Sequence, residues 1–169
     1  MAFDGVSGTV AAMSGTVEAR LKSLGVELPV PSAPGANYVP YQRSGSLLFL
    51  SGQLSHWNGE RVYVGKLGAE FDIADGQKAA RICGLNLISQ LSAALGGDLD
   101  RVARTVRLVG YVNSTADFHG QSQVMDGASD LFVEVFGDAG RHTRMAVGVS
   151  SLPYNVAVEV EAVIETADE

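Results

Sequence analysis

The longest uninterrupted pattern in the sequence is a helical stripe of apolar residues that begins near Asp75 and stops at Gly96-Gly97. Aspartate is a residue type that caps helix N-termini, and glycine ends helices because it adopts left-handed backbone conformations easily. The stripe consists of Ala79, Ile82, Leu85, Ile88, Leu91 and Leu95. A helix with such a stripe buries one face, so the chain must supply another layer to pack against it.

The other periodic segments predict strands and one further helix. The second helix is expected from about Gln121 to Phe136, with Gly137 as its stop. Strands are expected at 47–50, 102–112, 144–149 and 156–164, with a minor strand at 62–64. The last two strands are expected to form a closing hairpin. This order predicts one α+β domain in which both helices pack on one face of a sheet.

The last strand indicates what happens on the other face of that sheet. Its alternate residues 156, 158, 160, 162 and 164 are all apolar and are expected to face the helices. The opposite set combines Ala157 and Val163 with Glu159 and Glu161. A half-apolar face of this kind favours oligomerisation, with the carboxylates at a subunit junction.

The N-terminal part differs in composition from the rest. Residues 1–13 carry no strong period, and Ser14 is expected to cap a short helix that ends at Gly25. Four of the five prolines lie between Pro29 and Pro40, which predicts an extended connector on the surface. We therefore expect an N-terminal extension over residues 1–35 and the main domain over residues 36–169.

Composition excludes several classes of function. Lys and Arg number 12 against 19 Asp and Glu, and the net charge of −7 argues against nucleic acid as a partner. No apolar stretch approaches the roughly 20 residues of a membrane span, so a cytoplasmic location is expected. The single cysteine, Cys83, is expected to be a small core residue. Because His56, His119 and His142 lack metal-ligand spacing, no metal site is expected.

An arginine and a glutamate on the closing strands are the remaining chemical candidates. The planar guanidinium of Arg144 suits recognition of a substrate carboxylate. The carboxylate of Glu159 could orient that guanidinium, or hold and deprotonate water. An ordinary cross-strand ion pair would use the same two residues, and the pattern alone leaves both interpretations open.

Several segments resemble the RidA/YjgF family. The sequence R-M-A-V-G-V-S-S-L-P-Y-N-V-A-V-E-V-E-A, from Arg144 to Ala162, is similar to the family's C-terminal signature. L-F-L-S-G-Q-L at 48–54 and G-D-L-D-R-V at 97–102 agree with it as well. The resemblance covers about residues 36–165, and the N-terminal part looks like a longer branch of the family.

The resemblance implies a chorismate-mutase-like fold assembled as a homotrimer, with ligand sites at the subunit interfaces. Family members hydrolyse reactive enamines and imines to 2-keto acids and ammonia, without metal or cofactor. Some members are labelled endoribonuclease L-PSP. For this chain the resemblance implies an enamine/imine deaminase, a hydrolase of small 2-imino or 2-enamino acids.

The resemblance also implies roles for individual residues. Arg144 matches the arginine that binds the substrate carboxylate, and Glu159 matches the glutamate that orients the attacking water. Gly52, next to Ser51, matches a glycine that lines the site. Tyr41 resembles a tyrosine that lines the pocket, although its spacing to S-G-Q is shorter here.

Three positions depart from the family pattern. Ser129 falls near a helix position that is commonly Asn, Met145 stands where Ser is frequent, and His142 stands where Pro or Ala is usual. Such changes could alter substrate size or abolish deamination while binding is retained. A trimer that binds a small carboxylate without turnover therefore stays as an alternative. An endoribonuclease is a less favoured one, given the net charge of −7.

Overall fold

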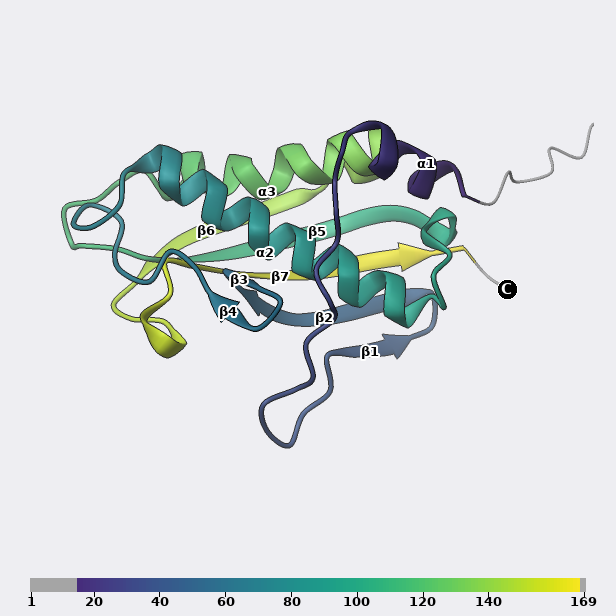
Figure 1. Cartoon of the computed structure of the whole chain (residues 1–169), viewed down its shortest axis with the longest axis horizontal. Helices are drawn as coiled ribbons and strands as arrows, with labels where there is room; N and C mark the ends of the chain where they lie inside the picture. Colours follow the sequence, from purple (N-terminus) through teal and green to yellow (C-terminus); the bar gives the residue numbers. More distant parts are fainter. Residues whose placement is uncertain (1–14, 168–169) are drawn as a thin grey trace, which may run out of the picture.

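The computed structural model describes residues 15–167. A five-stranded sheet in the order β1-β2-β7-β5-β6 carries the helices on one face (Figure 1). The strands are β1 (Tyr41–Ser44), β2 (Leu47–Leu54), β5 (Val102–Asn113), β6 (Thr143–Val149) and β7 (Val158–Thr166), and the helices are α1 (Thr16–Ser23), α2 (Ile73–Ala94) and α3 (Gln121–Phe136). A hairpin joins β3 (His56–Trp57) to β4 (Glu60–Arg61). The predicted α+β architecture is confirmed.

The strand order corrects one prediction. The expected closing hairpin is wrong, because β5 lies between β6 and β7. Strand β6 runs parallel to β5, and β7 runs antiparallel to β5 and β2. The link between β6 and β7 includes a short 3-10 turn, Pro153–Asn155, in which Tyr154 and Asn155 have positive φ angles. This link spans about two strand spacings, roughly 10 Å, to reach the far side of β5.

Helix α2 is buried almost all round in its second half. Its N-cap is Asp72, whose Oδ1 accepts a hydrogen bond from the backbone N–H of Asp75 at 2.9 Å. The proline-rich connector crosses the side of α2 that the sheet leaves free. There Ser89 Oγ donates to the carbonyl of Pro29 at 2.6 Å, and Gln90 Nε2 donates to the carbonyl of Ser32 at 2.7 Å. The expected helix cap at Ser14 lies outside the described residues.

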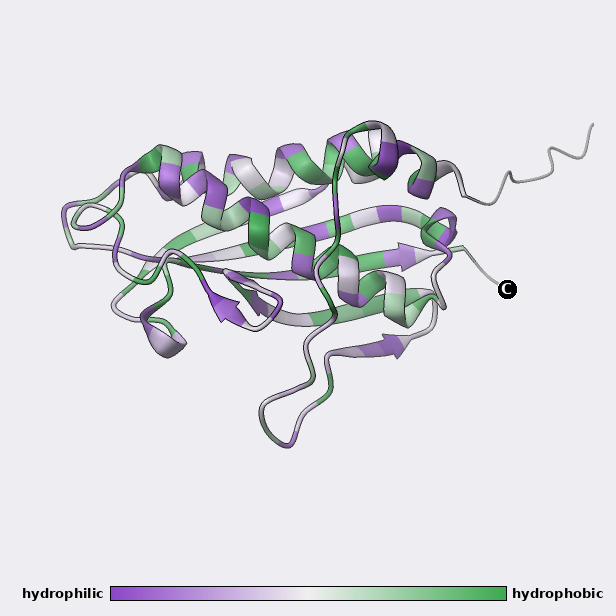
Figure 2. Ribbon diagram, viewed as in Figure 1, coloured by the Kyte–Doolittle hydropathy of each residue, from purple (hydrophilic) through white to green (hydrophobic). Residues whose placement is uncertain are grey.

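Alternate residues of strand β7 lie on the two faces of the sheet. Residues 158, 160, 162 and 164 are buried against the helices, whereas Glu159, Glu161 and Val163 are partly exposed on the opposite face. Figure 2 shows the apolar segments of β7 and α2 in green, and the hydrophilic β1 and β4 in purple. We call the second face the open sheet face, because no helix within residues 15–167 covers it (Figure 1). Its residues include Phe49, Arg107, Val109, Tyr111, Met145, Val147, Glu159, Glu161 and Val163.

Helices α2 and α3 approach each other closely at Gly127. A Cβ at this position would overlap the backbone carbonyl of Gln77 in α2, which has no room to move aside. We therefore expect Gly127→Ala to lower the free energy of unfolding by about 1–3 kcal/mol. Urea denaturation measures this loss. Gly35→Ala is the control, because its Cβ would meet nothing within 4 Å. Equal stability of the two variants would contradict close helix packing.

Candidate functional site

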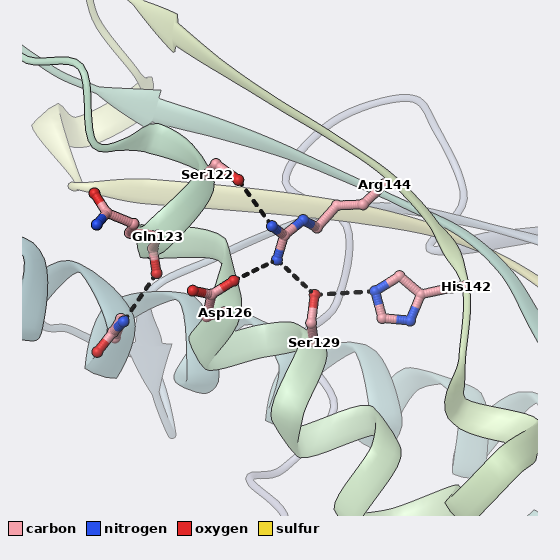
Figure 3. Close-up of polar contacts among 7 residues, drawn as sticks. Ser122, Gln123, Asp126, Ser129, His142 and Arg144 are labelled. Carbon is pink, nitrogen blue, oxygen red and sulfur yellow. Dashed lines mark hydrogen bonds and ion pairs between the residues drawn. The ribbon is translucent and has the colours of Figure 1, made fainter.

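Arg144 reaches from β6 to α3. It lies opposite Leu108 of β5, which is fully buried, so its side chain is on the helix side of the sheet. Its Nη1 donates to Asp126 Oδ1 at 2.8 Å and to Ser129 Oγ at 3.1 Å, and its Nη2 donates to Ser122 Oγ at 2.9 Å. Figure 3 shows the guanidinium held between these three side chains. Its orientation is therefore fixed by one helix.

The guanidinium keeps unused hydrogen-bonding capacity. Three of its five N–H donors serve α3, whereas Nε and the second Nη2 proton donate to no residue in the described part of the chain. The Arg144 side chain is 25% exposed. Nε–H and Nη–H form a planar fork that suits a carboxylate. Arg144 can therefore bind an external carboxylate without leaving the serines that orient it.

His142 continues this group of side chains. Its Nδ1 lies 2.6 Å from the carbonyl oxygen of Gly140, and its Nε2 lies 3.0 Å from Ser129 Oγ (Figure 3). A carbonyl only accepts, which assigns the proton to Nδ1 and makes Nε2 the acceptor of the Ser129 hydroxyl. Burial lowers the pKa of His142, the Gly140 carbonyl raises it, and the charge of Arg144 lowers it further. His142 is therefore neutral at pH 7 and holds Ser129 in place.

Glu159 belongs to a second group, on the open sheet face. It lies opposite Tyr111 of β5, and a Cβ on Gly52 would overlap its carboxylate. Burial, and secondarily the charge of Glu161, raises the pKa of Glu159. Burial also raises the pKa of Tyr111, with the charges of Glu161 and Glu159 adding to the effect. The missing side chain at Gly52 leaves room for the Glu159 carboxylate, and a carboxylate with a raised pKa can accept a proton from water.

The two groups are separated by the sheet within one chain. Arg144 shares a face with Leu108, whereas Glu159 lies opposite Tyr111, three residues further along β5 and on the other face. Ser129 is with Arg144, and Met145, 49% exposed, is on the open sheet face. One chain therefore brings Ser129 to Arg144, and separately Gly52 to Glu159, but does not bring the arginine to the glutamate.

A cavity of about 240 Å³ lies beside Gly52. Tyr38, His56, Arg61 and Tyr154 also line it. The guanidinium of Arg61 stacks over the ring of Tyr154 at 3.7 Å, which is a cation–π contact. Burial lowers the pKa of His56. The cavity therefore presents aromatic surface and one cation next to Ser51-Gly52-Gln53, which lies within β2.

Tyr38 and Tyr154 line this cavity, whereas Tyr41 lies outside it. Tyr41 pairs with the buried Leu50 and packs against the core, whereas Tyr38 is 54% exposed and lines the cavity. Ser51 does not line the cavity, and its Oγ donates to the carbonyl of Val39 at 2.7 Å. The role of Tyr41 as a pocket residue stays a prediction.

A family model described as "YjgF/chorismate mutase-like, putative endoribonuclease" matches residues 18–165. The chain belongs to the YjgF family. The match begins inside the segment expected to be an extension, so α1 falls almost wholly within the region that the family model covers.

Individual relatives agree with the YjgF assignment. The chain is 51% identical over 153 residues to Protein TCP17 of Trypanosoma cruzi, covering 90% of this chain and 95% of that protein. It is 45% identical to Atu1372 of Agrobacterium tumefaciens, a protein of unknown function, with a TM-score of 0.84 over 89% of this chain and 92% of the other. E. coli TdcF, crystallised with serine, shares the fold at 24% identity and a TM-score of 0.57, over 82% and 94% of the two chains.

Other candidate chemistries find little support in the YjgF-like domain. Cys83 is fully buried, its Sγ contacts the carbonyl of Val158, and burial raises its pKa, so it is a core residue rather than a nucleophile. Among residues 15–167, no three His, Cys, Asp or Glu side chains lie together as metal ligands would. None of the described helices is both long and apolar enough to span a membrane.

Proposed function

We propose that the protein hydrolyses small 2-imino or 2-enamino acids to 2-keto acids and ammonia. The observation that carries the proposal is the guanidinium of Arg144, which three side chains of α3 hold while Nε stays unpartnered within residues 15–167. A fixed fork of this kind binds the carboxylate of a small acid in one orientation. E. coli TdcF, which shares the fold, was crystallised with serine, a small amino acid with such a carboxylate.

The reaction needs little beyond orientation and proton transfer. Water adds to the electrophilic C=N carbon, forming a C–O bond while the π electrons move to nitrogen. The oxygen loses a proton to a base, and Glu159 has the raised pKa that suits this role. The base returns this proton to the nitrogen, and the remaining hydroxyl proton also passes to the nitrogen as the C–N bond breaks, so ammonia leaves and the C=O bond of the keto acid forms. A 2-enamino acid enters the same sequence after a proton has moved from its nitrogen to C3, which turns it into the 2-imino acid.

The proposal requires more than one protomer. Because Arg144 and Glu159 lie on opposite faces of one sheet, a site that uses both takes one residue from each of two neighbouring chains. We propose a homotrimer with the sites at its subunit interfaces. The exposed apolar side chains of Phe49, Met145 and Val147 on the open sheet face support such an assembly.

A trapping assay tests the activity. An amino-acid oxidase generates the imino acid in the presence of semicarbazide, which traps it as it forms. The active protein is expected to lower the trapped fraction and to raise the yield of keto acid. An unchanged trapped fraction over several amino acids would contradict the hydrolase.

A ligand-binding trimer without turnover is the second candidate. It is favoured by the ion pair between Arg144 and Asp126, since that pair gives the guanidinium a structural role without any reaction. Thermal-shift measurement separates the two candidates, because a binder is stabilised by carboxylates that it does not consume. RNA cleavage is opposed by the net charge of −7.

A further inference from the structure

We propose that Asp126 and Arg144 together select a zwitterionic ligand, one that carries a cationic nitrogen next to its carboxylate. The inference rests on the proposed function in taking Arg144 as the carboxylate anchor. It adds a second determinant, Asp126, and names the charge pattern of the ligand that the site accepts.

The ion pair between the two residues is the starting observation. Arg144 Nη1 and Asp126 Oδ1 are 2.8 Å apart, and the side chains are 25% and 45% exposed. Both charges are therefore within reach of a ligand from solvent. A simple anion that binds Arg144 places its own negative charge close to the carboxylate of Asp126. That repulsion lowers its affinity, since like charges at short range disfavour each other even near a protein surface.

A zwitterion avoids this repulsion, because its cationic group replaces Arg144 as the partner of Asp126. Its carboxylate takes N–H donors of Arg144, and its ammonium or iminium group donates to Asp126. In a 2-amino or 2-imino acid the two charges are separated by a single carbon atom, so one small molecule can meet both side chains of the ion pair. Every charge is then still paired after binding, which charge complementarity requires.

The remaining contacts suit this exchange because they are neutral. Ser122 Oγ and Ser129 Oγ accept from the guanidinium, and Ser129 is itself held by His142 Nε2. These hydroxyls orient Arg144 without competing for its charge. The two serine contacts, drawn in Figure 3, therefore hold the guanidinium even when Asp126 turns toward the ligand.

The selection distinguishes substrate from product. A protonated 2-imino acid carries the cation that Asp126 accepts, whereas the 2-keto acid that hydrolysis releases has lost its nitrogen. With the keto acid bound, Asp126 stays on Nη1 of Arg144 and its negative charge lies close to the product carboxylate. That repulsion favours product release.

Binding of two unreactive ligands tests the inference by calorimetry. Alanine and propionate share a carbon skeleton and a carboxylate, and they differ in the ammonium group. The wild-type protein is expected to bind alanine about tenfold more tightly than propionate. Asp126→Asn is expected to bind the two within about twofold, by losing affinity for alanine and gaining affinity for propionate.

Asp130→Asn is the matched control. Asp130 lies one helical turn after Asp126, is exposed, and its replacement changes the net charge equally. This variant is expected to keep the wild-type preference for alanine. Equal binding of the two ligands by wild type, an unchanged preference in Asp126→Asn, or the same loss in Asp130→Asn would each overturn the inference.

The experiment separates this inference from the hydrolase, because neither ligand is turned over. A preference for alanine that Asp126→Asn abolishes supports the zwitterion site even if the trapping assay shows no hydrolysis. Hydrolysis without any preference for alanine overturns the role of Asp126 alone. Unchanged binding of both ligands by Arg144→Ala overturns the carboxylate anchor on which both proposals depend.

Discussion

Arg144→Ala is expected to lower kcat/KM for imino-acid hydrolysis about a hundredfold. The variant removes the fork that binds the substrate carboxylate, and hydrogen bonds to a charged group contribute about 1.5–3 kcal/mol each. A loss of two such bonds corresponds to at least a hundredfold in rate. The trapping assay measures the loss, and calorimetry with alanine measures the matching loss of binding.

Arg141→Ala is the control for this variant. Arg141 precedes β6, its side chain is 73% exposed, and it pairs with Asp138 in the adjoining 3-10 turn. Its removal changes the net charge by the same amount and is expected to leave activity within about twofold. Arg144→Lys keeps the charge but loses the fork, so it should remain well below wild type. Full activity of Arg144→Ala would contradict the assignment of the anchor.

Glu159→Gln is expected to lower kcat about a hundredfold while KM changes little. Glutamine retains the shape of the side chain and its place beside Gly52, but it accepts no proton from water. A positioned general base contributes about 10²–10⁴ in rate. Steady-state kinetics measures this difference between kcat and KM. A rise in KM at constant kcat would instead make Glu159 a binding residue.

The pH profile gives the same variant a second readout. Glu159 acts as a base only when ionised, so wild-type kcat is expected to fall as the pH is lowered through the raised pKa of Glu159. Glu161→Gln removes the one charge that adds to burial in raising this pKa, which moves the loss of activity to lower pH. The same acid limb in Glu159→Gln as in wild type would assign the titration to another group.

Elements with a strong local period were predictable from the sequence. Helix α3 runs from Gln121 to Phe136, as predicted, because its apolar stripe is regular and Gly137 follows it. The predicted N-cap of α2, Asp75, lies three residues after the observed one, Asp72. Both aspartates are equally good caps in sequence, and only the structure shows that Asp72 is used. The prediction of a closing hairpin was wrong because tertiary contacts decide which strands pair, and short-range sequence patterns do not contain those contacts.

The candidate site divides in the same way. The motif singled out Arg144, Glu159 and Gly52 as candidates, because residue types at fixed spacing can be read from one sequence. The partners of Arg144 on α3 could not be predicted from the sequence. Nothing in the pattern distinguishes Ser122 and Asp126 from other polar helix residues, and their contacts with Arg144 form only because β6 lies beside α3. Their role depends on which strand forms the edge of the sheet, a fact that only the topology supplies.

The contacts of the connector with α2 affect the order in which the chain folds. Ser89 meets Pro29 and Gln90 meets Ser32 across separations of 60 and 58 positions. Such long loops lose much entropy on closure and gain little until the surface that receives them exists. The connector is therefore expected to dock after α2 has packed on the sheet. In native-state hydrogen exchange it should detach at a lower free energy than the core, exposing the polar side chains of α2 while the strands remain paired.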